Sequence, residues 1–190
     1  MVVLQLGKEI GMVSGIKSSA YLRGMHCVID ESLVVGENCT IGNFCIIEQG
    51  VVLGDNVQIS DYVKIPKNAI VGNDVVIGSY VRLGHDCMVG NRTIIKCHAV
   101  LSGDVLVGND CFIGPNAILL HLTPDNIHRP SRMEDGSYVG TGVYLNPGVI
   151  LGSRVVVGSG SVVTKSLNVP GVYVGTPARL SKIKIVDYDI

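Results

Sequence analysis

The sequence of 190 residues has no excess of either charge, no long apolar run and no leader-like start. Its 15 Lys and Arg residues and 16 Asp and Glu residues give a net charge of −1, with no basic run. A nucleic acid or an anionic membrane is therefore an unfavourable partner, because both attract clustered positive charge. No apolar run reaches the roughly eighteen residues that a membrane span needs. Residues 1–11 (MVVLQLGKEIG) are too short and too charged for a signal peptide, so we expect a cytoplasmic protein.

What the sequence does contain is a repeat of six residues. Every sixth residue across 29–119 is Ile, Leu or Val, which has a chance probability of roughly one in ten million. A period of six fits neither an α-helix nor a flat strand, so it describes a repeating coil. The series consists of Ile29, Val35, Ile41, Ile47, Leu53, Ile59, Ile65, Val71, Ile77, Leu83, Val89, Ile95, Leu101, Val107, Ile113 and Leu119.

The residue two places before each of these positions is small or β-branched, with Leu33 as the exception. A large and a small residue two apart are what a short strand shows when both side chains point inward. Nine of the sixteen aliphatic residues are followed by Gly, which allows a sharp corner. Three strands and three corners predict a triangular coil of about eighteen residues, stacked about 4.8 Å apart through parallel pairing. The sequence therefore predicts one all-β domain.

Six cysteines raise the question of disulfides or a metal site. Only Cys97 lies outside the small inward position of the repeat. We interpret the other five as buried packing residues, because free Cys behaves as a small hydrophobe, and we expect no disulfide. These five are Cys27, Cys39, Cys45, Cys87 and Cys111.

The repeat divides the chain into three parts. Residues 1–26 form an N-terminal cap segment, residues 27–169 the β-helix domain, and residues 170–190 a C-terminal cap and tail that covers an open strand edge. The repeat breaks after Leu119 and resumes at Val139, which predicts an extruded loop over about 120–138. A loop leaving a rigid scaffold is a preferred place for function, although it also fits a tolerated surface insertion.

One column of corner residues, spaced eighteen apart, combines His85, Gly103 and His121. The two histidines should lie two coils apart, roughly 10 Å, with the bare backbone of Gly103 between them. Acyl transfer needs such parts, namely a base with a pKa near neutrality and a donor for the developing oxyanion. Asp86 is a candidate to orient the imidazole of His85, and His121 is the alternative base. We interpret the remaining three histidines as structural or surface residues: His26, His98 and His128.

The six-residue spacing resembles the hexapeptide-repeat proteins, which implies a left-handed parallel β-helix. Residues 84–90 (GHDCMVG) and 102–108 (SGDVLVG) resemble the sugar acetyltransferases related to bacillosamine, perosamine and sialic acid O-acetyltransferases. That resemblance implies that His85 is the base toward a sugar amine or hydroxyl, with Asp86 as its acidic neighbour. It also implies that the backbone N–H of Gly103 holds the acetyl carbonyl. Members of these families are usually homotrimers with active sites between subunits.

Residues 158–165 (GSGSVVTK) and 174–179 (VGTPAR) resemble the acetyl-CoA-binding end of hexapeptide acyltransferases. The resemblance implies that acetyl-CoA is held by Gly103, Gly158, Ser159, Thr164, Lys165 and Arg179. The expected activity is acetyl transfer to a sugar, with a nucleotide-linked amino sugar as the expected acceptor and no metal.

Two other functions stay open at this point. The first is a metal-dependent hydratase of the γ-carbonic anhydrase type, which resembles this chain in having two histidines thirty-six residues apart, as His85 and His121 are. The third ligand of that enzyme would fall on Asn126, and the acetyl-CoA-like end would have no use. The second is a non-catalytic β-helix scaffold.

Overall fold

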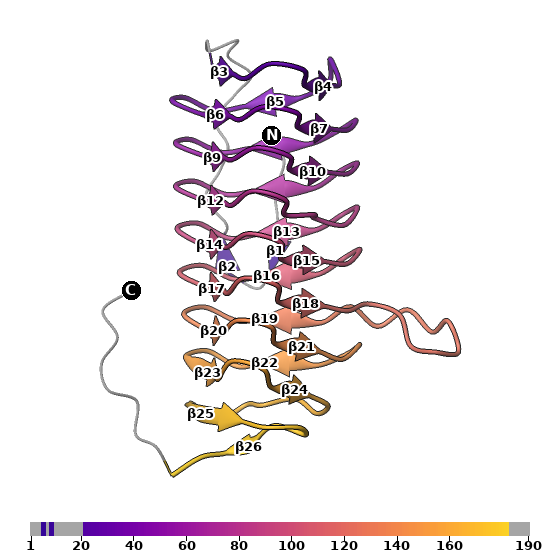
Figure 1. The fold of residues 1–190 in the computed structure, drawn as a ribbon, viewed down its shortest axis with the longest axis vertical. Helices are drawn as coiled ribbons and strands as arrows, with labels where there is room; N and C mark the ends of the chain where they lie inside the picture. Colours follow the sequence, from indigo (N-terminus) through magenta and orange to yellow (C-terminus); the bar gives the residue numbers. More distant parts are fainter. Residues whose placement is uncertain (1–4, 7, 10–20, 183–190) are drawn as a thin grey trace.

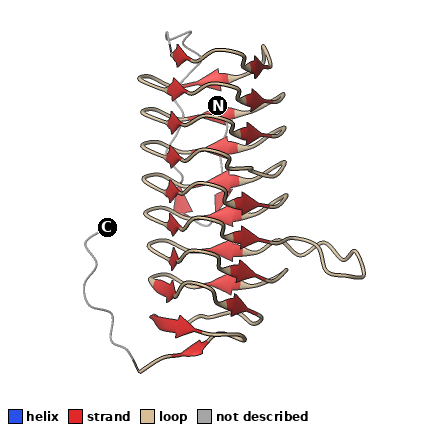
Figure 2. Cartoon of the chain, in the orientation of Figure 1, coloured by secondary structure: helices blue, strands red, loops and turns tan. Residues whose placement is uncertain are grey.

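The computed structural model describes residues 5–6, 8–9 and 21–182. Residues 21–182 coil from the top to the bottom of the view in Figures 1 and 2 through short strands. These strands stack into the three faces of a triangular prism. Strands of successive coils pair in parallel at the predicted eighteen-residue register, for example Ile59 with Ile77. The fold is therefore the all-β, left-handed parallel β-helix that the sequence predicts. Within the described residues, no helix is long and apolar enough to span a membrane.

Each face takes one strand from each coil, except that on the second face Arg82 forms only isolated bridges to Lys64 and Val100. The first face contains β3 (Leu22–Arg23), β6 (Thr40–Ile41), β9 (Gln58–Ile59), β12 (Val76–Ile77), β14 (Ile94–Ile95), β17 (Phe112–Ile113), β20 (Tyr138–Val139) and β23 (Val155–Val157), then β25 (Gly171–Val174) and β26 (Arg179–Leu180). The second contains β4 (Val28–Ile29), β7 (Ile46–Ile47), β10 (Lys64–Ile65), β15 (Val100–Leu101), β18 (Ile118–Leu119), β21 (Tyr144–Leu145) and β24 (Val162–Val163). The third contains β5 (Val34–Val35), β8 (Val52–Leu53), β11 (Ile70–Val71), β13 (Met88–Val89), β16 (Leu106–Val107), β19 (Arg132–Met133) and β22 (Ile150–Leu151). A separate antiparallel pair joins β1 (Gln5–Leu6) to β2 (Lys8–Glu9).

Columns of aliphatic side chains fill the prism. The inward residue of each strand from β6 to β24 is buried, as are the small residues that precede these strands. Cys39, Cys45, Cys87 and Cys111 are among the buried small residues, whereas Cys27 in the first coil is half-buried and Cys97 is exposed. All six thiols are free in this chain.

The three corners of the prism differ in chemistry. The aromatic corner, between the first and second faces, stacks five rings at centroid separations of 4.8 to 5.0 Å: His26, Phe44, Tyr62, Tyr80 and His98. The histidine corner, between the second and third faces, carries Lys67, His85, Gly103 and His121. The asparagine corner, between the third and first faces, carries Glu37, Asp55, Asn73, Asn91, Asn109 and Asp135.

The extruded loop leaves the histidine corner and is shorter than the sequence predicts. It spans 120–131, because Arg132 of β19 already pairs with Leu106 of β16 and Met133 is buried in the core. The expected bounds of about 120–138 are therefore wrong at the C-terminal end. Met133 takes an inward position that a search for Ile, Leu and Val alone passes over.

At both ends of the β-helix, strands extend the first face. The Leu22–Arg23 strand pairs with β6, so the coil begins a few residues before residue 27. At the other end, β25 pairs in parallel with β23 and β26 returns antiparallel to β25. Tyr173 in β25 is buried against the last coil, and its hydroxyl donates to the Val169 carbonyl at 2.9 Å.

Candidate active site

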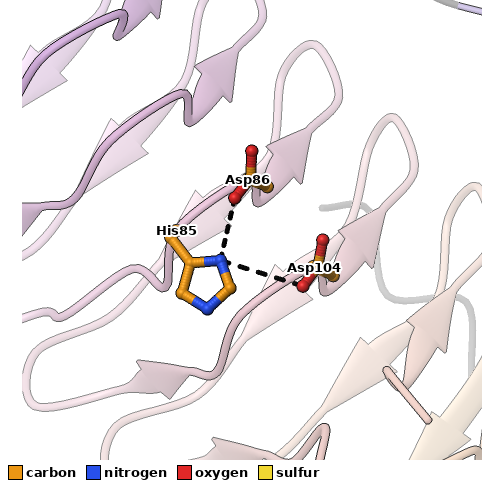
Figure 3. A group of neighbouring side chains, drawn as sticks. All are labelled: His85, Asp86 and Asp104. Atoms are coloured by element: carbon orange, nitrogen blue, oxygen red, sulfur yellow. Dashed lines mark hydrogen bonds and ion pairs between the residues drawn. The ribbon is translucent and has the colours of Figure 1, made fainter. Parts of the chain in front are cut away.

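The histidine corner brings the imidazole of His85 against two carboxylates, as Figure 3 shows. His85 lies just before β13, and Asp104 lies one coil further on. The main chain at Asp86 and Asp104 has positive φ, 56° and 57°, which Asp tolerates better than most residues. The side chains of His85, Asp86 and Asp104 are 47%, 41% and 35% exposed, so the corner opens to solvent in a single chain.

Asp86 orients the ring of His85. Its Oδ2 lies 2.8 Å from His85 Nδ1, and its Oδ1 accepts from Asn68 Nδ2 at 3.0 Å. The hydrogen bonds from Asn68 and then His85 lower the pKa of the Asp86 carboxyl. Asp86 is thus an ionised acceptor at neutral pH, so the proton of a neutral His85 resides on Nδ1. The Nε2 atom keeps its lone pair.

Gly103 lies directly beneath that free nitrogen. A Cβ at Gly103 would lie 2.5 Å from His85 Nε2 and 2.7 Å from His85 Cε1. Only glycine at this position therefore avoids a clash with the imidazole in its present position. Gly103 is buried, and its amide N–H donates to no group among the described residues. A buried amide without a partner calls for an explanation, and a bound oxygen atom would supply one.

The extruded loop adds two more imidazoles. His121 makes edge contacts with His85 and His128, at ring centroid distances of 6.2 and 5.5 Å. The His121 side chain thus comes closer to His85 than the roughly 10 Å expected from the coil spacing alone. Burial, followed by repulsion from His128 and His85, lowers the pKa of His121. His121 is therefore held mainly neutral.

His128 and Asp104 belong to the same cluster, although sequence reasoning assigned neither of them to it. His128 Nε2 donates to Asp104 Oδ2 at 2.9 Å, which ties the loop to the coil. The interpretation of His128 as a structural or surface residue therefore missed its place beside the site. The available signal was a second histidine in a loop that starts at His121, but the return path of a loop follows no repeat.

The cluster includes a group of metal-type donors. Among the described residues, one donor atom each of His85, Asp86 and Asp104 lies within 4.8 Å of the others. Nitrogen and carboxylate oxygen donors are ligands that zinc and related ions accept. The corner can therefore act as a base beside an amide donor, and it can also hold a cation.

The residues expected to hold acetyl-CoA, apart from Gly103, lie in three places. Thr164 and Lys165 are exposed on the histidine corner, with Lys165 four coils beyond His85, roughly 19 Å at about 4.8 Å per coil. Gly158 and Ser159 lie at the aromatic corner of the last coils, and Arg179 is exposed in β26. The structure thus separates these residues over two corners and the C-terminal strand.

Comparison with known proteins identifies the repeat. A family model described as bacterial transferase hexapeptide (six repeats) matches residues 32–67, 50–85, 68–103 and 130–165, more than half of the chain. No curated protein matches the sequence.

Several solved structures are similar to this chain at low sequence identity. The UDP-N-acetylglucosamine acyltransferase LpxA from Bacteroides fragilis 9343 is 19% identical with a TM-score of 0.62, over 84% of this chain and 74% of that one. The polySia-specific acetyltransferase NeuO is 19% identical with a TM-score of 0.50, over 90% of both chains. The acetyltransferase domain of PglB from Neisseria gonorrhoeae FA1090 is 19% identical with a TM-score of 0.43, over 82% of this chain. This chain spans only 57% of that PglB chain.

Proposed function

Because the chain belongs to the bacterial transferase hexapeptide family, we propose that it is an acetyl-CoA-dependent acetyltransferase. Its acceptor is an amino or hydroxyl group of a sugar, with a nucleotide-linked amino sugar as the first choice. The observation that carries this proposal is the free Nε2 of His85 above the unused amide N–H of Gly103. A base and an oxyanion donor side by side are what attack on a thioester needs.

The reaction proceeds by direct attack. The acceptor nitrogen or oxygen forms a bond to the thioester carbonyl carbon while its proton passes to His85 Nε2. The carbonyl oxygen takes up the negative charge and is stabilised by the Gly103 N–H. When the intermediate collapses, the carbon–sulfur bond breaks and CoA leaves as the thiolate, which takes the proton from His85. Asp86 holds the ring in place and stabilises the imidazolium that forms in between.

Acetyl-CoA runs along the histidine corner in this proposal, with its thioester at Gly103 and its phosphates toward Thr164 and Lys165. Gly158, Ser159 and Arg179 lie on other surfaces, so they contact the cofactor only where it bends around the last coils or where a second copy joins. The 47% exposure of His85 favours a homotrimer, because a neighbouring subunit would exclude water from the base. The six free thiols fit a reducing compartment, so we assign the protein to the cytoplasm.

A metal-dependent hydratase is the second candidate function. His85, His121 and His128 gather in one corner, and three imidazoles are a zinc ligand set. Against it, His128 Nε2 is already bonded to Asp104, and Asn126 stands where the resemblance requires the third histidine. Stoichiometric zinc in the purified protein together with CO₂ hydration would favour this candidate.

Substitution of the base tests the leading proposal. We expect His85→Ala to lower turnover at least about a hundredfold, the usual scale for a general base, with little change in the KM for acetyl-CoA. His98→Ala is the matched control, because His98 is also an exposed corner histidine but belongs to the aromatic stack. Steady-state kinetics with a panel of nucleotide-linked amino sugars provides the measurement.

Calorimetry with acetyl-CoA separates the remaining outcomes. Saturable binding to about one site per chain would support an acyltransferase, whereas no heat at millimolar ligand would overturn the proposal. Retention of His85→Ala activity within about threefold would transfer the role of base to His121.

A further inference from the structure

We propose that His85, Asp86 and Asp104 form a divalent-metal site that switches off the base. Zn²⁺ is the divalent ion that best fits a ligand set of one imidazole nitrogen and two carboxylate oxygens. The inhibitory part of this inference depends on the proposed function, whereas the binding part does not.

The separations between the donor atoms are already similar to those between neighbouring ligand atoms in a zinc site. His85 Nδ1 lies 2.8 Å from Asp86 Oδ2 and 3.8 Å from Asp104 Oδ2. In a tetrahedral zinc site with bonds of about 2.0 to 2.2 Å, neighbouring donors are roughly 3.3 Å apart. All three donor atoms lie within 4.8 Å of one another, so rotation of these partly exposed side chains can bring them around one ion. Figure 3 shows the three side chains side by side.

Both carboxylates are held in place by a further hydrogen bond. Asn68 Nδ2 donates to the far oxygen of Asp86 at 3.0 Å, and His128 Nε2 donates at 2.9 Å to Asp104 Oδ2, the oxygen that also faces His85. Hydrogen bonds from a second layer of residues orient the ligands of metal sites in the same way and strengthen binding. His128 thereby couples the extruded loop to the occupancy of the site.

The charges of the cluster also favour a cation. Two carboxylates face the imidazoles of His85 and His128, and among the described residues neither forms an ion pair with Lys or Arg. Asp110 at the asparagine corner provides a contrast, because Arg92 binds both of its oxygens. A divalent ion in place of the Nδ1 proton would neutralise Asp86 and Asp104.

Occupancy of the site changes the tautomer of His85. An imidazole that binds a metal through Nδ1 carries its proton on Nε2, which is the atom above Gly103. An Nε2–H group donates but cannot accept a proton, so it cannot deprotonate the acceptor. The bound metal therefore acts as a reversible inhibitor that blocks no substrate pocket.

Calorimetric titration of untagged, chelator-treated protein with ZnCl₂ tests binding without any substrate. All variants carry Cys97→Ser, because Cys97 is an exposed thiol that could bind zinc on its own. We expect about one site per chain with micromolar affinity, weakened at least about tenfold by Asp104→Asn and by His128→Gln. Asp110→Asn is the matched control and should leave the affinity unchanged. Equal affinity in the parent and in Asp104→Asn, or equal losses in Asp104→Asn and Asp110→Asn, would overturn the site.

Zinc inhibition of acetyl transfer tests the switch. We expect zinc to suppress turnover of the parent, EDTA to restore it, and Asp104→Asn to need at least about tenfold more zinc for the same fractional inhibition. Stoichiometric binding without inhibition would overturn the switch and leave the proposed function standing. Zinc binding in a protein that transfers no acetyl group would overturn the proposed function and leave the metal site standing.

Discussion

At the asparagine corner, the amide N–H in each of five successive coils donates to a side-chain oxygen one coil further on, at distances between 2.7 and 2.9 Å. At the histidine corner, the amide N–H of Gly103 has no such acceptor among the described residues, because His121 stands where the pattern would place Asn or Asp. The same coil geometry thus builds one corner at which five successive amide N–H groups are bonded and another at which the amide N–H of Gly103 is left available.

The difference locates stability and chemistry in separate parts of one prism. At the asparagine corner the bonded amides stabilise the fold and leave no donor for a substrate. At the histidine corner an unbonded amide lowers local stability, but its N–H and the free imidazole nitrogen can both contact a substrate. Substitutions at the two corners should therefore change different observables. Those at the asparagine corner should change the free energy of unfolding, and those at the histidine corner should change turnover.

The largest effect of this kind is expected from Gly103→Ala. The added methyl group would stand 2.5 Å from His85 Nε2, which displaces the base and covers the amide N–H. We expect turnover to fall about a hundredfold or more, the scale for loss of an oxyanion donor. The free energy of unfolding should change by less than about 1 kcal/mol, because only the end of one side chain must move. Kinetics and urea unfolding of the same preparation provide both values.

Gly108→Ala at the asparagine corner is the matched substitution. There a Cβ would meet the backbone of the next coil, 2.8 Å from the Asp135 nitrogen, so main chain must shift. We expect a loss of about 1 to 3 kcal/mol in the free energy of unfolding, with normal turnover per folded molecule. The comparison fails if Gly103→Ala and Gly108→Ala lose stability equally while Gly103→Ala keeps its activity.

Much of the fold could be predicted from the sequence, because its interior is periodic. Ile65 and Leu101 are buried because they occupy inward positions of the six-residue repeat. Cys97 is exposed because it does not occupy such a position. The predicted loop was wrong where the residue type departed from the pattern. Met133 fills an inward place, so the loop ends before β19 rather than before β20.

The candidate site was predictable only in its periodic part. His85 and Gly103 are eighteen residues apart, so the stacking register alone brings them together. Asp86 directly follows His85 in the sequence and therefore lies at the same corner. His128 reaches Asp104 through an irregular loop, and no spacing in the sequence determines where such a loop returns. The His85–His121 distance depends on the conformations of the two side chains, which cannot be predicted from the separation of their coils.

An acceptor introduced at the histidine corner would make it resemble the asparagine corner. Asn109 accepts from the Asn91 N–H at 2.8 Å, and His121 occupies the equivalent place relative to Gly103. We expect His121→Asn to bind the Gly103 N–H, to raise the free energy of unfolding by about 0.5 to 1.5 kcal/mol and to lower turnover about tenfold relative to His121→Ala. Both variants lack the imidazole, so their difference reports on the amide alone. Identical kinetics in the two variants would argue against Gly103 as the oxyanion donor.

The opposite change removes an acceptor from the asparagine corner. Asn91 Oδ1 accepts from the Asn73 N–H at 2.7 Å, in a part-buried position. We expect Asn91→Ala to lower the free energy of unfolding by about 1 to 3 kcal/mol, because the donor loses its partner. Turnover of the folded protein should not change. Urea unfolding measures the loss, and an unchanged midpoint would show that water replaces the acceptor at this corner.

The smallest expected effect is a dependence of stability on pH that belongs to the histidine corner alone. Burial and the neighbouring imidazoles lower the pKa of His121 below its ordinary value of 6.5, so the folded protein takes up this proton less readily than the unfolded chain. Stability is therefore unaffected by this group above about pH 6.5 and decreases as the pH falls below that value.

Asp110 at the asparagine corner behaves differently, because its hydrogen bonds to Arg92 lower the pKa of its own carboxyl group from 3.8. The Asp110 contribution is present above that value and is lost only as the pH falls below it. We expect urea unfolding between pH 7.5 and 5.5 to show a smaller decrease in stability for His121→Ala than for the parent, whereas Asp110→Asn should follow the parent in this range. Parallel curves for His121→Ala and the parent would mean that burial and the neighbouring imidazoles do not lower the pKa of His121.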